Sequence, residues 1–587
     1  MSVETPITTR PELEDLADVG RESLYPDELK VLVGRASCGK AAGADDAFDA
    51  LEQTVADAEE ITVESTGCLG FCAREPLVEV VYPDGRGIVY EDVRHEAAVE
   101  LGEALIAGRD PSGVSVLGVR SHDDNTSIPS DQIEDADGSA TELSTLDFYA
   151  NQERIVLRNA GLIDPESVAE YVARGGYFPL WDALHGFSPE EVIEEIQASN
   201  LRGRGGAGFP TGLKWELTRN ASGEEKYVIC NADEGDPGAY MDRSVLESDP
   251  FAVIEGMTIG GFAIGAETGI VFVRAEYPLA IRRLEEAIEA AREYGLLGED
   301  ILGTGVDFDV EIKEGAGAFV AGEETALIKS IESKRGEPEP RPPYPAESGL
   351  YGQPTNINNV ETWANVPRIV EHGASWFDDI GTEASSGTKV FSLTGDLDNT
   401  GLVEVPMGTS IEEIVYEIGG ADPGSIKAVQ TGGPSGGCIA TERFETPVDY
   451  DSLQDVGSIM GSGGMIVMDQ DTCMVEVARY FLSFTQEESC GKCPPCRIGT
   501  KHMLDILETL TEGRGSEADI ERLEELSTYV AESSLCGLGQ TAPTPVESTL
   551  RYFRSEYEAH LDGECPAGEC VSGATHDQAA ELGGEDV

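Results

Sequence analysis

Three evenly spaced cysteines beside two consecutive prolines constrain this chain more than any other feature of its sequence. Cys490, Cys493 and Cys496 lie in the segment ESCGKCPPCRIGT. Pro494 and Pro495 stop a helix from running through the segment, which leaves backbone N–H groups free to point at sulfur. Structural zinc sites usually take two separate Cys-x2-Cys pairs. Three thiols at this spacing better suit a [4Fe–4S] cube, in which each thiolate binds a different iron atom.

The fourth ligand of such a cube must come from another segment. Cys536, in AESSLCGLGQTAPTP, lies in a glycine-rich turn between two helical stretches. We therefore predict a [4Fe–4S] cluster held by Cys490, Cys493, Cys496 and Cys536. The alternatives are a zinc site and a purely structural role for these cysteines.

The charge of the chain is extreme. Its 587 residues include 111 Asp and Glu against 40 Lys and Arg, a formal net charge of −71. Such a surface repels nucleic acid and anionic membranes. Screening this much self-repulsion requires a high ionic strength, so we expect a halophilic protein from a cytoplasm rich in salt.

The sequence predicts a location inside the cell. The first residues contain no apolar run typical of a secretory signal. The most apolar segment, GMTIGGFAIGAETGIVFV, is rich in glycine and contains Glu267, which argues against a membrane span. Twelve cysteines in a cytoplasmic protein indicate metal or redox chemistry rather than disulfides.

A chain of this length should form several domains. Changes in periodicity and composition predict a multidomain α/β protein. We expect these parts in order: a disordered leader (1–27), a small α/β domain (28–110), a linker (111–144), a layered α/β domain (145–370), a β-rich domain with one helix (371–455), a helical domain holding the thiols (456–560), and a disordered tail (561–587).

A glycine loop in LRGRGGAGFPTGLKW is a candidate phosphate site. Gly203 and Gly206 allow close approach of a ligand, and Arg204 and Lys214 could offset phosphate charge. The pattern G-x-G-x-x-G is weak alone, and the preceding segment EEVIEEIQASN reads as a helix rather than the strand of a Rossmann motif. A tight turn is the alternative.

Two further segments follow predicted strands. In VICNADEGDPGAYMDR, the side chains of Asn231, Asp233 and Glu234 could accept hydrogen bonds from ribose hydroxyls or flavin N–H groups. In FDVEIKEGAGAFVAGEETALIKSIE, a glycine loop stands between a strand and a helix, as in a cofactor crevice. Glu323 and Glu324, at the start of this helix, could bind nucleotide hydroxyls or simply complement the helix dipole.

Other candidate contacts are aromatic or amide side chains. Phe319 and Tyr344 could stack on a ring system, although aromatic residues more often belong to a core. The segment PTNINNVETW carries closely spaced amides, among them Asn358 and Asn359, which could bind a flavin or form turns.

Five of these segments together resemble the NADH-binding flavoprotein subunit of respiratory complex I, which defines the family of the 51 kDa subunit. The same family provides diaphorase subunits of NAD-linked hydrogenases and formate dehydrogenases. The resemblance covers about residues 145–560. Asp236, in DEGDPG, is more similar to the hydrogenase and formate dehydrogenase branch. The resemblance implies a Rossmann-like domain that binds FMN and NADH, then a ubiquitin-like β-grasp domain, then a helical [4Fe–4S] domain.

The resemblance also assigns residues to each cofactor. It implies FMN contacts by Gly203, Arg204, Gly206, Lys214, Asn231, Asp233, Gly322, Asn358, Asn359 and Thr362. It implies NAD(H) contacts by Phe209, Glu234, Phe319, Glu323, Glu324, Arg341 and Tyr344. The cluster ligands are the same four cysteines that the spacing predicts.

Residues 28–110 resemble the thioredoxin-like [2Fe–2S] ferredoxins that are often fused to this family. Cys38, Cys68 and Cys72 match three of the four expected ligands, and Val33 stands where the fourth is expected. We expect that the cluster is lost and the domain is kept for docking, while a [2Fe–2S] cluster completed by Cys565 or Cys570 is the alternative.

The implied activity is hydride transfer between NAD(H) and FMN, followed by single-electron transfer through the [4Fe–4S] cluster to a partner subunit. No side chain is expected to act as an acid or base. Alternatives are an NAD-reducing subunit of a formate dehydrogenase or hydrogenase, an NADPH-specific enzyme, and a scaffold without cofactors. We expect other subunits of an electron-transfer complex as partners, with no nucleic acid and no membrane span of its own.

Overall fold

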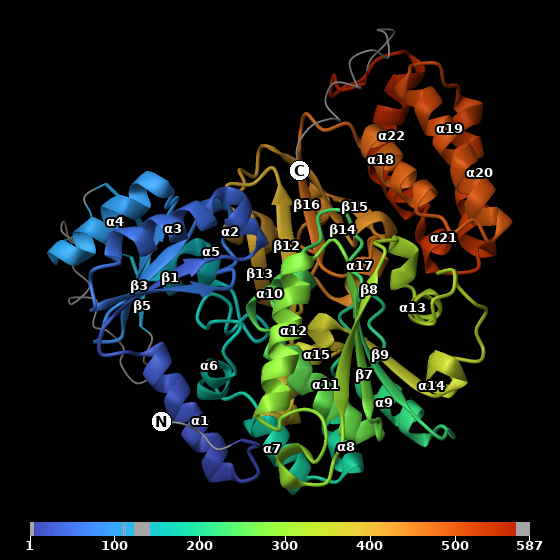
Figure 1. Ribbon diagram of the computed structural model, residues 1–587. Coiled ribbons are helices and arrows are strands. Elements are labelled where there is room, and N and C mark those ends of the chain that lie inside the picture. Colours follow the sequence, from blue (N-terminus) through green and yellow to red (C-terminus); the bar gives the residue numbers. More distant parts are fainter. Residues whose placement is uncertain (1–4, 110, 112, 122–140, 571–587) are drawn as a thin grey trace.

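The computed structural model describes residues 5–109, 111, 113–121 and 141–570. Three sheets of four or five strands and a helical domain follow one another along the chain (Figure 1). A further two-stranded sheet is formed by β10 (Gly381–Thr382) and β11 (Ser385–Ser386). The N-terminal domain and the C-terminal helices lie at opposite ends of the molecule, with the other two sheets between them. No helix within the described ranges is long and apolar enough to cross a membrane.

The predicted disordered leader is mostly a helix. α1 (Arg10–Leu24) begins at a capping box between Thr9 and Glu12, with a proline in its first turn. Its buried face joins the largest core of the molecule. A side chain at Gly20 would collide with the backbone of α6 (Val168–Ala173), so the close crossing of these helices requires glycine there. The prediction of disorder for residues 10–24 was therefore wrong.

The N-terminal domain is an α/β domain, as predicted, but it extends further along the chain. β1 (Leu29–Gly34) pairs in parallel with β2 (Ile61–Thr66) and antiparallel with β3 (Val78–Val81). The predicted linker supplies its edge strand, β5 (Ser115–Ser121), and residues 122–140 of that linker lie outside the described residues. The sheet has the order β2-β1-β3-β4-β5 and includes β4 (Arg86–Glu91), α2 (Ser37–Ala42), α3 (Ala44–Val55) and α4 (His95–Ala107).

The next domain contains a four-stranded parallel sheet of order β8-β7-β6-β9. α11 (Pro250–Ile264), whose residues are almost all buried, packs against this sheet. The most apolar sequence segment is thus the end of α11 followed by β7. The elements are α5 (Asp147–Ala150), α7 (Phe178–Gly186), α8 (Pro189–Ala198), α9 (Thr211–Asn220), β6 (Tyr227–Ala232), α10 (Met241–Ser248), β7 (Thr268–Arg274), α12 (Pro278–Glu293), β8 (Asp309–Gly315), α13 (Glu324–Ile331), α14 (Pro345–Ser348), β9 (Thr355–Asn359), α15 (Val360–His372) and α16 (Ala374–Asp378).

The third sheet extends beyond the predicted β-rich domain. It has the order β13-β12-β16-β14-β15, with the first and last strands, β12 and β16, parallel at its centre. β16 lies within the range predicted for the helical domain, so the boundary moves from 456 to about 470. The elements are β12 (Thr388–Gly395), β13 (Gly401–Pro406), β14 (Ile426–Thr431), β15 (Gly437–Ala440), α17 (Tyr450–Asp455) and β16 (Gly464–Asp469).

The helical domain has its own core, formed by α18 (Met474–Glu487), α19 (Thr500–Thr511), α20 (Glu517–Ser533) and α22 (Thr544–Leu561). Short helical turns η10 (Pro495–Gly499) and α21 (Gly537–Thr541) follow the cysteine segments. Cys565, Ala567 and Cys570 pack against the core, so the first part of the predicted disordered tail is ordered. Residues 571–587 lie outside the described residues.

Candidate functional site

Two adjoining cavities lie at the carboxyl ends of the parallel strands. The Asp233 cavity has a volume of about 440 Å³ and the Lys214 cavity about 580 Å³. They share lining residues from the glycine loop, from β6, from β9 and from the loop after β8. The crevice outside the carboxyl ends of a parallel sheet is where α/β domains bind ligands.

The structure brings the predicted nucleotide-site residues together. All of them line one or both cavities except Arg204 and Thr362, namely Gly203, Gly206, Phe209, Lys214, Asn231, Asp233, Glu234, Phe319, Gly322, Glu323, Glu324, Arg341, Tyr344, Asn358 and Asn359. Segments separated by more than a hundred residues in the sequence thus meet at one crevice.

The side chains of Arg204 and Thr362 contact other parts of the protein. The Arg204 side chain is fully buried, and its guanidinium donates to the carbonyl oxygens of Thr388 at 3.0 Å and Ser386 at 2.7 Å. The hydroxyl of Thr362 accepts from the Arg204 amide at 2.8 Å. These side chains line neither cavity, so they anchor the glycine loop instead of facing a ligand.

Two positions of the glycine loop leave no room for a side chain, because other chain segments pack closely against them. Gly206 and Gly208 have φ values of 113° and 62°. A Cβ on Gly206 would lie 3.1 Å from a backbone atom of Gly461, and one on Gly208 would strike the Tyr450 ring. The loop is therefore clamped against the third sheet's domain while its outer side faces the cavities.

Asp233 supplies an unsatisfied acceptor inside the Asp233 cavity. The residue is only 8% exposed, and neither carboxylate oxygen has a hydrogen-bond partner among the described residues. Burial raises its pKa to about 7. Its amide donates to Asn231 Oδ1 at 3.1 Å, and Asn231 in turn donates to the Gly322 carbonyl at 2.9 Å. A buried carboxylate without a partner fits a ligand that offers N–H or O–H donors.

Glu234 also lines this cavity, but its carboxylate is satisfied. It accepts from the amides of Asp242 at 3.0 Å and Arg243 at 3.1 Å, at the start of α10. Burial raises its pKa. The Glu234 carboxylate therefore stabilises the turn into α10 and is not a free acceptor for a ligand.

Lys214 brings positive charge to the floor of the Lys214 cavity. Its Nζ donates to the Ile357 carbonyl at 2.8 Å and lies 4.0 Å from a Glu324 oxygen. Burial lowers its pKa. Asn358 accepts through Oδ1 from Trp215 Nε1 at 3.1 Å and from Asn356 at 2.7 Å, which leaves its own N–H groups as donors. A cation and an amide donor at one surface suit an anionic oxygen, such as that of a phosphate.

The two acidic residues at the start of α13 have different roles. Glu323 caps the helix and accepts from the amides of Thr325 at 3.0 Å and Ala326 at 3.2 Å. Glu324 pairs with Arg341 at 2.5 Å. The helix-dipole alternative thus describes Glu323 well. Glu324 lies at the Lys214 cavity with its charge partly neutralised.

Large aromatic side chains stand at the mouth of the Lys214 cavity. Phe209 is 45% exposed and Tyr344 is 53% exposed, and both line the cavity. Exposed aromatic rings at the edge of a cavity of this size are suited to stack on a base or nicotinamide ring.

The four predicted cluster ligands surround one small cavity, the four-thiol cavity. Cys490, Cys493, Cys496 and Cys536 line it together with Val320, Pro338, Ser489, Lys492, Leu535 and Leu538. Cys536 caps α21, and amides of that turn point at its sulfur, while burial raises its pKa to about 11. Four thiols around one space match the ligand set of a [4Fe–4S] cluster, so these residues fit the group.

Val320 and Leu538 separate the thiols from the crevice. Both residues line the four-thiol cavity and the Asp233 cavity. Val320 comes from the loop after β8 and Leu538 from α21, so the wall joins two domains. Only a single layer of side chains therefore divides the two spaces.

Several lining residues were not predicted from the sequence. They come from glycine-rich segments of the third sheet's domain and from α21, and include Gly432, Ser435, Gly461, Ser462, Gly537 and Thr541. The runs TGGPSGG and MGSGGM were the available signal, because clustered glycines mark places where another backbone or a ligand approaches closely.

The three N-terminal thiols also lie near one another. The neighbouring Cys38 and Cys68 thiols, together with burial, raise the pKa of the Cys72 thiol. Arg243 Nη2 lies 3.6 Å from Cys38 Sγ, which places this group against α10. Val33, which stands where the fourth cysteine ligand would be expected, is buried in β1. Cys565 and Cys570 belong to a different group at the opposite end of the molecule, so they do not complete this one.

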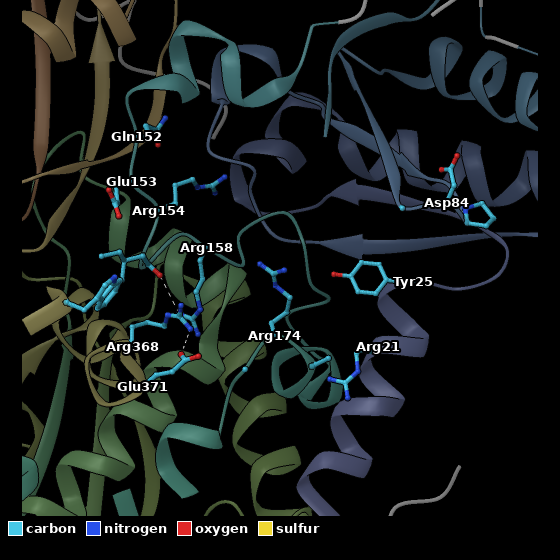
Figure 2. Close-up of a pocket in the computed structure, with 16 residues that line it drawn as sticks. Arg21, Tyr25, Asp84, Gln152, Glu153, Arg154, Arg158, Arg174, Arg368 and Glu371 are labelled. Carbon is cyan, nitrogen blue, oxygen red and sulfur yellow. Dashed lines mark hydrogen bonds and ion pairs between the residues drawn. The ribbon is translucent and has the colours of Figure 1, made fainter. Parts of the chain in front are cut away.

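A larger cavity of about 1030 Å³ lies elsewhere, between α1, the β3–β4 turn and the segment 152–158 (Figure 2). Arginines dominate its lining, including Arg154, Arg158, Arg174 and Arg368. It contains none of the residues predicted for a cofactor or metal. Size alone therefore does not identify the functional site, which is marked by the glycine loop, the unsatisfied carboxylate and the nearby thiols.

Comparisons with known proteins agree with this geometry. Residues 196–368 match the Nuo51 FMN-binding domain, and residues 476–560 match the NADH-ubiquinone oxidoreductase-F iron-sulfur binding region. The first range contains most of the crevice and the second contains all four predicted cluster ligands.

Relatives cover much of the chain. It is 56% identical over 428 residues to HndC, a subunit of the NADP-reducing hydrogenase of Solidesulfovibrio fructosivorans, covering 72% of this chain and 87% of the relative. It is 46% identical over 417 residues to an F-type subunit of the NADH-quinone oxidoreductase of Rhizobium meliloti, covering 70% of this chain and 99% of the relative.

A solved structure extends the similarity to almost the whole chain. A chain of NAD+-reducing [NiFe]-hydrogenase in the H2-reduced state has a TM-score of 0.63 and 29% identity, covering 94% of this chain and 90% of that one. The fold is thus the multidomain α/β fold of that hydrogenase chain. The protein belongs to the family formed by the F-type subunits of NADH-quinone oxidoreductases and the diaphorase subunits of hydrogenases, flavin-dependent NADH oxidoreductases that pass electrons from FMN through a [4Fe–4S] cluster within larger complexes.

Proposed function

We propose that FMN lies along the floor shared by the Asp233 and Lys214 cavities, and that NAD(H) enters above it at the mouth between Phe209 and Tyr344. The observation that carries this proposal is the wall of Val320 and Leu538, which lines both the crevice and the four-thiol cavity. Bound FMN supplies the chemistry that accepts an electron pair as hydride and releases electrons singly.

The residues of the chain position the reactants. Asp233 accepts a hydrogen bond from a ring N–H or hydroxyl of the ligand, because its carboxylate oxygens have no partner among the described residues. Lys214 and Asn358 bind anionic oxygen at the other end of the floor. Closely packed glycines keep side chains out of the space that the ring system needs. No side chain is required to transfer a proton in the hydride step.

The proposed ligands of the cluster are Cys490, Cys493, Cys496 and Cys536. Val320 and Leu538, which line both spaces, form the apolar wall between them.

Anaerobically purified and reconstituted protein tests the assignment. We expect one FMN and four irons in the cluster, bleaching of the flavin absorbance by NADH, and an electron paramagnetic resonance signal of the reduced cluster. Asp233→Asn should weaken FMN binding without changing the iron content. Binding of NADH to a protein that takes up no flavin would contradict the proposal and support a scaffold.

NADP(H) is a second candidate because one relative is named as part of an NADP-reducing hydrogenase. Arg341, 41% exposed at the Lys214 cavity, could meet a 2′-phosphate, but it is paired with Glu324. We therefore favour NAD(H), since the Glu324 carboxylate would repel that phosphate. The ratio of kcat/KM for NADH and NADPH decides, and Glu324→Gln should shift it towards NADPH.

A hydrogenase is the partner that we favour. Two similar proteins, at 56% and 29% identity, are named as parts of hydrogenases. Hydrogen-dependent NAD+ reduction by the native complex tests this choice, whereas formate- or quinone-dependent activity would point to the other branches. The predicted cytoplasmic location, peripheral to a membrane only through partner subunits, stays part of this proposal.

The finer fold assignments are also proposals. The parallel β1–β2 pair followed by antiparallel strands supports a thioredoxin-like N-terminal domain. The order β13-β12-β16-β14-β15, with β12 and β16 parallel, supports a ubiquitin-like β-grasp domain. With three thiols and Val33 in place of a fourth, we propose that the N-terminal domain serves docking rather than a [2Fe–2S] cluster.

A further inference from the structure

A second group of metal-ligating side chains lies at the start of α18, away from the four-thiol cavity. Cys473, His560, Cys565 and Cys570 each direct one ligand atom to a common point, and these atoms all lie within 4.8 Å of one another. Cys473 directly precedes α18, His560 lies in the last turn of α22, and the other two follow α22. Three separate parts of the helical domain therefore converge.

We propose that these four residues bind a single Zn²⁺ ion in a closed, tetrahedral Cys3His site. A tetrahedral zinc ion with Zn–S bonds of ~2.3 Å has ligand atoms about 3.8 Å apart. Cys473 Sγ lies 3.6 Å from Cys570 Sγ and 3.7 Å from His560 Nε2. The ligand atoms thus already have the spacing of such a site.

The same distances argue against two other states. A disulfide requires sulfurs ~2.05 Å apart, and all twelve cysteines are free thiols in the structure. A cubane distributes its ligands over different irons. Four atoms gathered within 4.8 Å can share one ion, whereas the cube needs a space such as the four-thiol cavity.

Neighbouring groups orient the ligands. A carbonyl oxygen can only accept, so His560 Nδ1 donates to the Glu556 carbonyl at 2.7 Å and Nε2 keeps its lone pair for a metal. The Cys570 amide donates to Cys565 Sγ at 3.4 Å. The Cys473 amide donates to Glu569 at 2.8 Å. Such hydrogen bonds are usual around metal ligands and fix their orientation.

Zinc fits this ligand set better than a redox metal. Three thiolates and one imidazole form a familiar structural zinc site. Cys473 and His560 are buried, and the other two ligands are half-buried, which leaves no open coordination position for a substrate. Zn²⁺ has no redox chemistry, so the ion would fasten the segment after α22 to α18 without entering the electron path.

The position of the proposed zinc ion at one end of α18 suggests what the ion would stabilise. The loop with Cys490 begins just beyond the other end of α18, whose 14 residues span about 20 Å. A fixed α18 therefore holds that loop at a constant distance from the nucleotide crevice. The proposed ion would act on the cluster only through this helix.

Metal analysis of the full chain, purified anaerobically without chelators, tests the proposal. We expect one zinc per chain in addition to the cluster iron. X-ray absorption at the zinc edge should give about three sulfur neighbours at ~2.3 Å and one nitrogen at ~2.0 Å. Cys565→Ser combined with Cys570→Ser should remove the zinc and keep the iron. Cys490→Ser, as the matched variant, should lower the iron and keep the zinc.

Three results would overturn the proposal. They are wild-type protein without zinc after growth with added zinc, iron rather than zinc at these ligands, and unchanged zinc content in the double variant. A disulfide among these cysteines in the metal-free wild-type protein would likewise exclude the site. If the double variant does not fold, the absorption spectrum of the wild type decides alone.

Discussion

The two ends of α18 hold ligand groups of similar size that face different surroundings. Beyond its C-terminal end, four thiols surround a cavity whose wall also belongs to the nucleotide crevice. At its N-terminal end, three thiols and an imidazole converge on one point. The Glu569 carboxylate accepts from the Cys473 amide, and the Glu556 carbonyl accepts from His560 Nδ1. Four soft ligands around a space suit a cluster that exchanges electrons, whereas a compact mixed set suits a single structural ion.

The largest effect should come from removing a ligand on the crevice side. Cys536→Ala removes one corner of the proposed cube, so the cluster should be lost and NADH-dependent electron delivery to a one-electron partner should fall at least ~100-fold. NADH should still bleach bound FMN, because Cys536 does not line the crevice. Iron content, zinc content and stopped-flow flavin absorbance measure the three outcomes. Loss of zinc in this variant would mean that the two groups are not independent.

A ligand change at the other end should act on stability instead. His560→Ala should remove the proposed zinc and lower the Tm by roughly 5 °C or more, since each kcal/mol shifts the Tm of a domain of this size by ~4–8 °C. The cluster signal should persist at low temperature. Calorimetry with and without added zinc, beside electron paramagnetic resonance, measures both. An unchanged Tm would show that the core alone holds this end of α18.

Asp233 tests the nucleotide crevice separately from the two ligand groups, because its carboxylate lines the crevice without a hydrogen-bond partner among the described residues. Burial raises its pKa from 3.8 to about 7. Between these values the folded protein without FMN binds more protons than the unfolded chain. Its stability should therefore fall as pH rises from about 4 to 7, with the whole penalty present above pH 7.

Asp233→Asn should remove this pH dependence in the protein without FMN. Its Tm should exceed that of the wild type at pH 8 and match it near pH 4. The same variant should bind FMN about 10- to 100-fold more weakly, because a hydrogen bond to a charged group contributes ~1.5–3 kcal/mol. Thermal scans across pH and a flavin titration measure the two effects. Equal pH profiles for both proteins would mean that Asp233 is solvated or paired in solution.

The sequence predicted the crevice because its residues follow local rules. Asn231 lies near the end of β6, Asp233 directly follows that strand, and Asn358 lies near the end of β9, so parallel pairing of the two strands brings these residues together. The four proposed cluster ligands could also be selected from the sequence, since three of them lie in one short segment. In both cases a local sequence pattern and one long-range pairing were enough to propose the group of residues.

Side-chain direction was not predictable from a motif. Arg204 lies within the glycine loop, yet its guanidinium turns to carbonyls near β12, which are distant in the sequence. The motif places the backbone of the loop, while the partners of the side chain come from another domain. A glycine motif therefore indicates where the backbone of the loop lies, but not which groups the Arg204 side chain contacts.

Two boundary errors have similar causes. The helix over residues 10–24 was missed although Thr9, Pro11 and Glu12 form a recognisable helix start. β16 was assigned to the helical domain because it lies next to α18, but its partner β12 is far away in the chain. The Cys473 and His560 pair was missed for the same reason, as no local spacing connects these residues.

The smallest predicted effect concerns a residue that touches no metal. Glu569 accepts a hydrogen bond from the Cys473 amide at 2.8 Å, and so holds the start of α18 to the segment that carries Cys570. Glu569→Ala should weaken zinc binding about 10-fold, as expected for a group that orients a ligand, and leave the iron signal unchanged. Competition with a chromophoric chelator measures the affinity. Glu564→Ala, an exposed position in the same segment, is the matched control and should bind zinc as the wild type does. Equal weakening in both variants would indicate that loss of negative charge, rather than the lost hydrogen bond, is responsible.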